Sequence, residues 1–251
     1  MKPLVMGVLN VTPDSFSDGG RWLDAGAAVA HGLRMVEEGA DVVDVGGEST
    51  RPGAEPVPVD EELRRVLPVV EALAPHVRVS IDTRKPEVAE AAITAGASLV
   101  NDVSASLAPV AAAAGKGVGW VAMHMKGDPR TMQDDPTYDD VVAEVRAFLV
   151  ERASTAGVDE VWIDPGIGFG KTVEHNLALL AHLDELVATG FPVVVGASRK
   201  SFLGRLTGGA PAEDRVEASV AVAAWALSQG AVMVRAHDVR PTVEAARLLA
   251  S

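Results

Sequence analysis

Four polar side chains, far apart in the chain, have the chemistry to bind one flat heterocycle; they are Asp82, Asn101, Asp164 and Lys200. A carboxylate only accepts hydrogen bonds, a lysine only donates them, and an asparagine does both. The edge of a polar heterocycle alternates N–H and C=O groups, and one carboxylate can accept two adjacent N–H donors. We therefore expect these four residues to recognise a planar, polar ring.

Helix capping is the alternative role for the two aspartates. The sequence Pro-Gly-Ile-Gly-Phe-Gly separates Asp164 from the next predicted helix, so capping accounts poorly for it. Asp82 is more ambiguous, because Thr83 and Pro86 behind it are compatible with a helix start. Capping therefore stays open as an alternative for Asp82.

A second set of side chains is cationic and suits an anion; it comprises Arg51, Lys200, Arg235 and His237. Arg235 and His237 lie two residues apart at a predicted strand end, so their side chains point to the same face. Arg51 precedes Pro52, which keeps this loop non-helical, and its guanidinium suits a carboxylate or phosphate. The alternative for Arg51 is a solvated surface side chain.

Asn10 is placed where a divalent cation could join such an anion. Mg2+ prefers oxygen ligands, keeps several waters, and is usually held by one or two protein oxygens together with substrate phosphates. The sequence offers no competing transition-metal site, since it has no cysteine and His124, His175 and His182 share no ligand spacing. We expect Mg2+ as the cofactor, with Asn10 as its single protein ligand.

The stretch of residues 6–20 is typical of a strand that leads into a polar loop. Its apolar run is too short for a helix, ends at Asn10, and is broken at Pro13. The loop then carries a concentrated set of functional groups: Asp14, Ser15, Phe16, Ser17 and Asp18. We interpret it as part of an active site; a tight turn with capping residues is the alternative.

Eight strand-then-helix units are predicted to position these residues. The strands are expected at residues 6–10, 41–46, 77–82, 98–102, 119–124, 161–165, 192–198 and 231–235. The helices are expected at residues 25–38, 61–73, 86–95, 108–114, 139–156, 174–187, 213–229 and 239–250. The connections between these units are short, and no stretch of the sequence is typical of a linker between domains. The pattern therefore predicts an α/β fold, a single-domain (β/α)8 TIM barrel over residues 1–251. A doubly wound open sheet is the alternative.

Every predicted strand has a functional side chain at its carboxyl end. These residues are Asn10, Asp44, Asp82, Asn101, His124, Asp164, Ser198 and Arg235. In a barrel the carboxyl ends of all strands form one mouth, which is where barrel active sites lie. One or two such residues would be ordinary caps or turns, but a complete set indicates a shared site.

Composition excludes several classes of function. A net charge of -13 argues against nucleic acid and anionic membrane partners. The absence of cysteine excludes disulfides, thiol catalysis and thiolate metal sites. The chain has no run of about 18 apolar residues and no signal-peptide pattern, so we expect a soluble, cytoplasmic protein.

Seven sequence blocks, in order along nearly the whole chain, resemble those of the bacterial dihydropteroate synthases. They begin at Met6 (MGVLNVTPDSFSDGG), Asp44 (DVGGESTRPG), Ser80 (SIDT), Asn101 (NDVS), Asp164 (DPGIGFGK), Gly196 (GASRKSFLG) and Arg235 (RAHDV). Each block is weak alone, but the ordered set is highly specific. The resemblance implies a pterin-binding barrel, usually a homodimer. Such an enzyme condenses dihydropterin methyl diphosphate with p-aminobenzoate in folate biosynthesis and releases pyrophosphate.

The resemblance also implies roles for individual residues. The pterin would be held by Asp82, Asn101, Asp164 and Lys200, with Met123 lining its slot and Arg235 stacking over it. The diphosphate and Mg2+ would be bound by Asn10, Arg235 and His237. Two loops would close over the site with Phe16, Asp18, Thr50, Arg51 and Pro52. The p-aminobenzoate would be flanked by Phe169, Lys200 and Ser201, and Ser198 is a further substrate contact. Because sulfonamides mimic p-aminobenzoate, their binding is implied too.

This assignment agrees with the chemistry of the residues. Loss of the diphosphate leaves a cation on the pterin methylene, so catalysis should come from neutralising the leaving group and placing the amine. We expect Asp18 to stabilise the cation, and Phe16 and Arg51 to orient the amine. Two residues depart from the family pattern, since Ala105 replaces a more common glycine and Ala236 a more common valine.

Three rival functions are compatible with parts of this pattern. A pterin-binding methyltransferase could share the pocket but would not need the diphosphate residues, and a non-catalytic pterin-binding paralogue would lose loop or anion residues first. In an unrelated aldolase, Lys200 would form a Schiff base. For the homodimer, the apolar helix around Trp225 places the predicted interface on the last helices.

Overall fold

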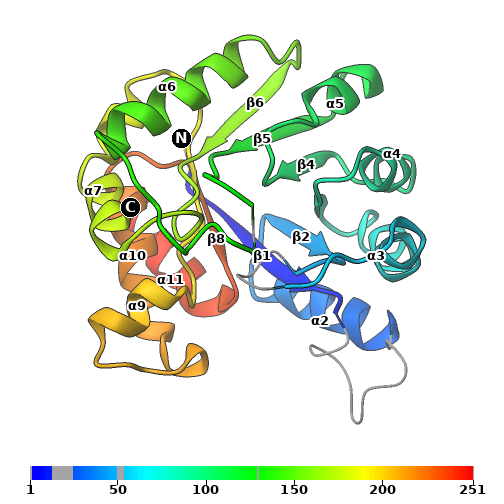
Figure 1. Cartoon of the computed structure of the whole chain (residues 1–251). Helices are drawn as coiled ribbons and strands as arrows, with labels where there is room; N and C mark the ends of the chain where they lie inside the picture. Colours follow the sequence, from blue (N-terminus) through cyan, green and yellow to red (C-terminus); the bar gives the residue numbers. More distant parts are fainter. Residues whose placement is uncertain (1, 13–24, 50–53, 129, 251) are drawn as a thin grey trace.

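The computed structural model describes residues 2–12, 25–49, 54–128 and 130–250. Eight parallel strands form one sheet (Figure 1). They are β1 (Leu4–Asn10), β2 (Val42–Gly46), β3 (Arg78–Asp82), β4 (Leu99–Asp102), β5 (Gly119–Met123), β6 (Glu160–Asp164), β7 (Val194–Val195) and β8 (Met233–Ala236).

The order of the strands closes the sheet almost completely into a barrel. Neighbours follow the order β6-β5-β4-β3-β2-β1-β8-β7. A parallel bridge between Ile163 and Val193 joins the two remaining edges, and the Ile163 N–H donates to the Pro192 carbonyl at 3.0 Å. The predicted (β/α)8 barrel is therefore confirmed, and the doubly wound alternative is wrong because it would reverse the strand order at a switch point.

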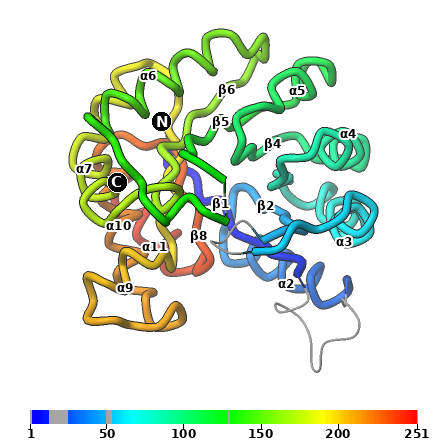
Figure 2. Tube along the Cα trace, in the orientation of Figure 1, coloured from blue at the N-terminus to red at the C-terminus, as the bar shows by residue number. Residues whose placement is uncertain are grey.

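The helices surround the sheet on its outer side (Figure 2). They are α2 (Ala25–Glu37), α3 (Val59–Leu73), α4 (Pro86–Thr94), α5 (Ala108–Ala114), α6 (Val141–Ser154), α7 (Val173–Ala181), α8 (Leu183–Val187), α9 (Ser201–Leu206), α10 (Val216–Ser228) and α11 (Val239–Leu249). None of the helices in the described ranges is both long and apolar enough to cross a membrane.

The strands bury side chains on both faces and so create two cores. One core packs the outward side chains of the strands, such as Val43 and Ile81, against the helices. The second lies inside the barrel and contains Met6, Val42, Leu99, Val121, Trp162, Val194 and Met233. Because side chains alternate along a strand, the residues two positions further on also point inward. Four of those positions carry polar residues of the mouth, namely Asp44, Asn101, Asp164 and Arg235.

The opposite end of the barrel is closed by an ion pair. The Arg78 guanidinium donates to both carboxylate oxygens of Glu160 at 2.8 Å and to the Ser98 carbonyl at 3.0 Å. The Trp162 indole N–H donates to Glu160 at 2.7 Å. This pair joins the starts of β3 and β6, far from the strand ends that form the mouth.

Two predicted elements differ from those observed, and one observed helix was not predicted. The helix predicted at 174–187 is divided at His182 into α7 and α8, and the strand predicted at 192–198 is reduced to the two residues of β7. The helix α9 was not predicted, because six residues are too few to show a helical period.

Candidate functional site

The inward polar residues form one layer directly above the apolar interior of the barrel. Adjacent strands place them in register, with Gly46 opposite Asp82, Asp82 opposite Asn101, and Met123 opposite Asp164. Asp82, Asn101, Met123 and Asp164 are all buried. The mouth predicted from the strand ends is therefore present.

Arg235 organises this layer from β8. Its Nε donates to Asp44 Oδ2 at 2.6 Å and its Nη2 donates to Asp82 Oδ2 at 2.7 Å. The Asn101 amide also donates to Asp44 Oδ2, at 2.9 Å. Asp44, which the sequence marked only as a strand end, thus orients two residues of the predicted pocket. Burial disfavours the charge of Arg235, but the neighbouring Asp44 and Asp82 outweigh it and raise the pKa of the guanidinium.

Two carboxylate oxygens of this layer are buried without a partner. Among the described residues, nothing donates a hydrogen bond to Asp44 Oδ1 or to Asp82 Oδ1, and the buried Ser80 hydroxyl is likewise unpartnered. Burial raises the pKa of Asp82 to about 7; Arg235 opposes this shift, whereas Asp44 and Glu62 add to it. A buried acceptor without a donor costs about 1–3 kcal/mol, which a ligand with N–H groups would recover.

Neither aspartate of the predicted pocket caps a helix. Asp82 pairs with Arg235, and α4 begins after Lys85 without any side-chain cap. Asp164 Oδ1 accepts the Gly166 N–H at 2.7 Å, inside the loop that follows β6. Burial raises the pKa of Asp164, and Lys200 partly offsets the effect. The capping alternative is therefore wrong for Asp82.

The loop after β6 packs tightly against the end of β5 because of its glycines. Gly166 has a φ of 64°, and a Cβ there would lie 1.9 Å from the His124 carbonyl oxygen. Gly170 has a φ of 59°, and its Cβ would lie 2.3 Å from the Lys126 carbonyl oxygen. Only glycine fits both positions. Phe169 lies between them, half-buried at the mouth.

Lys200 reaches across this loop from the start of α9. Its ammonium donates to the Ile167 carbonyl and lies 4.5 Å from the centre of the Phe169 ring. Burial lowers the pKa of Lys200 to about 8, although Asp164 favours the charged form. Lys200, Phe169 and Asp164 are thus brought together as predicted, and Ser201 follows Lys200 at an exposed position of α9.

A buried lysine that the sequence reasoning missed holds the same loop in place. The Lys171 ammonium contacts His124 Nδ1 at 3.0 Å and donates to the carbonyls of His124 at 3.2 Å and Phe169 at 3.0 Å. Burial lowers the pKa of Lys171 to about 7 and that of His124 to about 3. The strand-end position of His124 was the available signal, but its partner comes from another loop.

The ends of β7 and β8 are joined by Ser198 and His237. The Ser198 hydroxyl accepts the His237 backbone N–H and contacts His237 Nδ1, both at 3.1 Å. Arg199 has a φ of 59°, in the left-handed region, and its guanidinium pairs with Asp238, with Nε at 2.9 Å. The structure thus brings His237 and Ser198 together beside Arg235, while Asn10 ends β1 half-buried.

Some predicted site residues cannot be placed. Phe16, Asp18, Thr50, Arg51 and Pro52 lie outside the described residues. Within the described ranges, no group of three or more histidine, aspartate or glutamate side chains is arranged to hold a metal ion. A cage made of protein carboxylates is therefore not present in that part of the chain.

Comparison with known proteins points to one family. The profile described as "Pterin binding enzyme" matches residues 6–237. The dihydropteroate synthase of Mycobacterium leprae is 52% identical over 262 residues, covering 98% of this chain and 92% of that protein. The Xanthomonas albilineans dihydropteroate synthase with 4-aminobenzoic acid superposes with a TM-score of 0.91 at 52% identity, covering 98% of this chain and 92% of that one. The structure of that enzyme with 7,8-dihydropteroate superposes with a TM-score of 0.87 at 48% identity, and it covers the same shares of the two chains.

Proposed function

The chain belongs to the pterin-binding enzyme family and, within it, to the dihydropteroate synthases, and from this premise we propose how its residues carry out the reaction. It is a transferase that joins (7,8-dihydropterin-6-yl)methyl diphosphate to p-aminobenzoate, giving 7,8-dihydropteroate and pyrophosphate. The observation that carries the residue assignment is the pair of buried acceptors, Asp44 Oδ1 and Asp82 Oδ1, at the barrel mouth.

The pterin ring binds in the layer around these acceptors. Its amino and ring N–H groups donate to Asp82 and Asp164, and Asn101 and Lys200 complete the polar edge. Met123, buried beside Asp164 on the neighbouring strand, supplies an apolar wall, and the planar Arg235 guanidinium lies against the ring face. The fixed Arg235–Asp44 pair holds that guanidinium before substrate arrives.

The diphosphate binds beside Arg235, His237 and Ser198, which meet at the ends of β7 and β8. A lone amide oxygen at Asn10, without a carboxylate cage among the described residues, fits an Mg2+ ion that arrives with the diphosphate. When bound, Mg2+ would offset charge on the pyrophosphate leaving group. Arg235 and His237 stabilise the same charge from the protein side.

The p-aminobenzoate binds between Phe169, Lys200 and Ser201. The ammonium of Lys200 over the Phe169 ring forms one wall of this position. To residues outside the described ranges we assign the following roles by the family pattern: Thr50, Arg51 and Pro52 serve the binding of this substrate, Phe16 and Arg51 act on its amine, and Asp18 stabilises the pterin cation. Sulfonamides compete with p-aminobenzoate for this position.

The test is pyrophosphate release from dihydropterin methyl diphosphate with Mg2+, with and without p-aminobenzoate. We expect release and dihydropteroate formation by the wild type, and a loss of about 100-fold in kcat/KM in Lys200→Ala. Lys116→Ala, which changes an exposed lysine after α5, is the matched control. Pterin binding without release would favour the non-catalytic paralogue or the methyltransferase.

The protein forms a homodimer through its last helices. Trp225 on α10 is 48% exposed, and Leu248 and Leu249 at the end of α11 are 79% and 45% exposed. Burying such side chains against a second copy removes apolar surface from water. Trp225→Glu should give a monomer in sedimentation, and a dimer that survives this change and Leu248→Glu would place the interface elsewhere.

A further inference from the structure

Every carbonyl group in the loop of residues 166–170, which follows β6, accepts a hydrogen bond from the protein. The Gly166 carbonyl accepts the Phe169 N–H at 3.0 Å. The other four accept from side chains: Ile167 from Lys200, Gly168 from Gln133 Nε2 at 2.6 Å, Phe169 from Lys171 Nζ at 3.0 Å, and Gly170 from the Tyr138 hydroxyl at 2.8 Å. Surface loops commonly leave such groups to water, so complete pairing indicates that the shape of this loop is held deliberately.

The loop cannot set its own shape, because three of its five residues are glycine. Gly166, Gly168 and Gly170 all have a positive φ, of 64°, 84° and 59°. Glycine loses more conformational freedom on folding than any other residue. Contacts from neighbouring elements must therefore fix the loop, and with it the Phe169 ring that lies between Gly168 and Gly170.

The side chains that hold the loop are of two kinds. Lys171 and Lys200 are cationic and also act on the pterin layer, since both favour the ionised form of Asp164. Gln133 and Tyr138 are uncharged and come from the connection between β5 and α6. These two residues therefore hold the loop without a charge that acts on the Asp164 carboxylate.

The ring of Tyr138 is itself held in place, so the position of its hydroxyl is fixed in advance. It meets the His175 ring of α7 edge-on, with 4.9 Å between ring centres, and the Lys126 ammonium lies 4.2 Å from its centre. Burial raises the pKa of the Tyr138 phenol, so the hydroxyl stays a protonated donor near neutral pH. Gly170 is buried, and its carbonyl depends on this donor.

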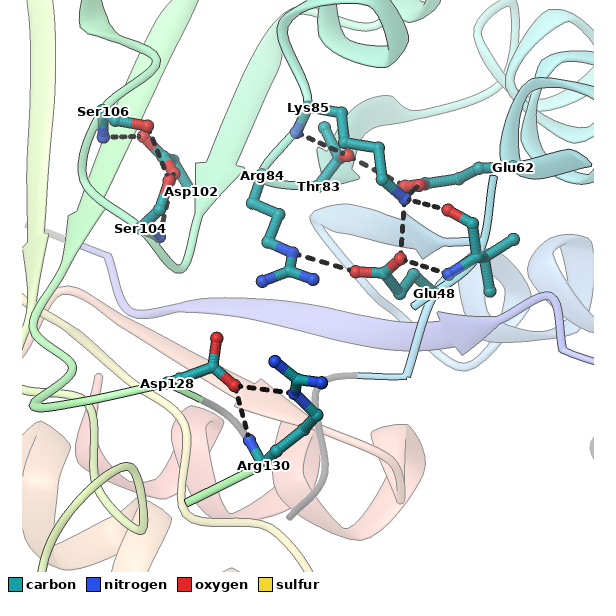
Figure 3. Close-up of polar contacts among 11 residues, drawn as sticks. Glu48, Glu62, Thr83, Arg84, Lys85, Asp102, Ser104, Ser106, Asp128 and Arg130 are labelled. Carbon is teal, nitrogen blue, oxygen red and sulfur yellow. Dashed lines mark hydrogen bonds and ion pairs between the residues drawn. The ribbon is translucent and has the colours of Figure 1, made fainter. Parts of the chain in front are cut away.

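Gln133 follows a fixed turn but contributes less. Asp128 Oδ1 accepts the Arg130 N–H at 3.0 Å (Figure 3), and the Asp128 carbonyl accepts the Met132 N–H at 2.7 Å. The side chain of Met132 is buried, which anchors the backbone next to Gln133. Gln133 is exposed, however, so water competes for the Gly168 carbonyl when its side chain is removed.

We propose that Tyr138, assisted by Gln133, is a positioning residue for the p-aminobenzoate half of the reaction. Its hydroxyl holds the Gly170 end of the loop and so fixes the Phe169 ring, which forms one wall of the position of that substrate. The inference rests on the proposed function for the identity of the second substrate. Neither Tyr138 nor Gln133 touches substrate in this account.

The two ends of the loop are held independently, which limits the effect to the second substrate. At the end next to β6, the Gly166 N–H donates to Asp164 Oδ1 at 2.7 Å. This bond does not involve Tyr138, and Asp164 belongs to β6 itself. Releasing the Gly170 end should therefore move the Phe169 wall and leave the pterin layer in place.

The test variant is Tyr138→Phe, which removes the hydroxyl but keeps the ring against His175 and Lys126, so the fold is retained. We expect the KM for p-aminobenzoate to rise about fivefold, and about tenfold when Gln133→Ala is added, while the KM for the pterin diphosphate changes by less than about twofold. Thr189→Val is the matched control. It removes a half-buried hydroxyl that donates to the Leu186 carbonyl at 2.6 Å, in the turn after α8, and should change neither constant.

A readout without activity separates this inference from the proposed function. The Phe169 amide should exchange its hydrogen faster in Tyr138→Phe than in the wild type and in Thr189→Val, because the loop opens more often. Unchanged exchange, or equal changes of both KM values, would overturn the inference. A wild type that forms no dihydropteroate would refute the proposed function, and the exchange rates would then still decide whether Tyr138 fastens the loop.

Discussion

Two buried ionic clusters lie at the carboxyl ends of neighbouring strands, and they differ in one respect. In the cluster of Lys85, Glu48 and Glu62 (Figure 3), each ammonium donor and each carboxylate oxygen has a partner. In the cluster around Arg235, Asp44 Oδ1 and Asp82 Oδ1 have none among the described residues. A closed cluster holds backbone in place, whereas an open one keeps acceptors ready for a ligand.

The difference also separates stability from activity. Breaking the closed cluster leaves buried charges uncompensated, so its cost falls on folding. Changing an open acceptor removes an interaction that only the ligand completes, so its cost falls on binding and catalysis. Two substitutions and one titration test this comparison, and a third substitution tests a strained position outside both clusters; they follow in decreasing order of expected effect.

The largest effect is expected from Lys85→Met. It leaves the carboxylates of Glu48 and Glu62 buried beside each other without their cation, and should lower the free energy of unfolding by about 3–5 kcal/mol. Urea denaturation measures this value. Arg78→Met, which breaks a more exposed ion pair, should cost about 1 kcal/mol or less. Equal losses of unfolding free energy in the two variants would show that the closed cluster contributes no more to stability than the more exposed ion pair does.

Asp82→Asn tests the open cluster. The amide keeps the shape of the side chain but loses the carboxylate that faces the pterin, so kcat/KM should fall about 100-fold, or roughly 2.7 kcal/mol. Steady-state kinetics measures the loss, and the exposed Asp159→Asn is the control. A loss of unfolding free energy without a loss of activity would assign Asp82 to the scaffold.

The pH dependence of pterin binding gives a third test. Burial raises the pKa of Asp82 from 3.8 to about 7 in the free protein, and N–H donors from the pterin favour the ionised form. Below about pH 7, binding must therefore expel a proton, and affinity should fall by up to about tenfold per pH unit. Calorimetry in buffers of different ionisation enthalpy measures the number of protons released on binding. Asp82→Asn should abolish this release; its persistence would point to another group.

The smallest effect is expected at the departure Ala105, which has a φ of 50°. Ala105→Gly relieves the strain of a left-handed backbone conformation, which costs about 1–2 kcal/mol. It also removes a buried methyl group and increases the conformational entropy of the unfolded chain, and these two losses together are of about the same size as the gain. The unfolding free energy should change by less than about 1 kcal/mol. Ala122→Gly on β5 lacks the strain to relieve and should cost more. A larger loss in Ala105→Gly than in Ala122→Gly would refute the strain argument.

The sequence could predict the barrel because its signals are local. Short apolar strands, helical spacing and a polar residue at each strand end all fall within about ten residues of one another. The same regularity predicted that Asp82, Asn101, Asp164 and Arg235 share a mouth. The two-residue strand β7 and the break at His182 escaped prediction, since closure of the barrel and packing decide them rather than local pattern.

The contacts within and around the site could not be predicted in the same way. Lys85 meets Glu62 across 23 positions and Glu48 across 37, and Arg235 meets Asp44 across 191. No periodicity connects such residues. Asp44 was visible as a strand end and Lys171 only as a member of a sequence block, and the partners of both became clear from the fold. The predicted cytoplasmic location and the homodimer stay predictions.

The central claim is that the open acceptors at the barrel mouth receive the pterin, and a crystal structure with the dihydropterin methyl diphosphate in the absence of p-aminobenzoate tests it most directly. The account predicts a pterin N–H donor about 2.7–3.2 Å from Asp82 Oδ1, with the ring beside Met123 and against Arg235. A pterin bound elsewhere, or one that leaves Asp82 Oδ1 without a donor, would contradict it.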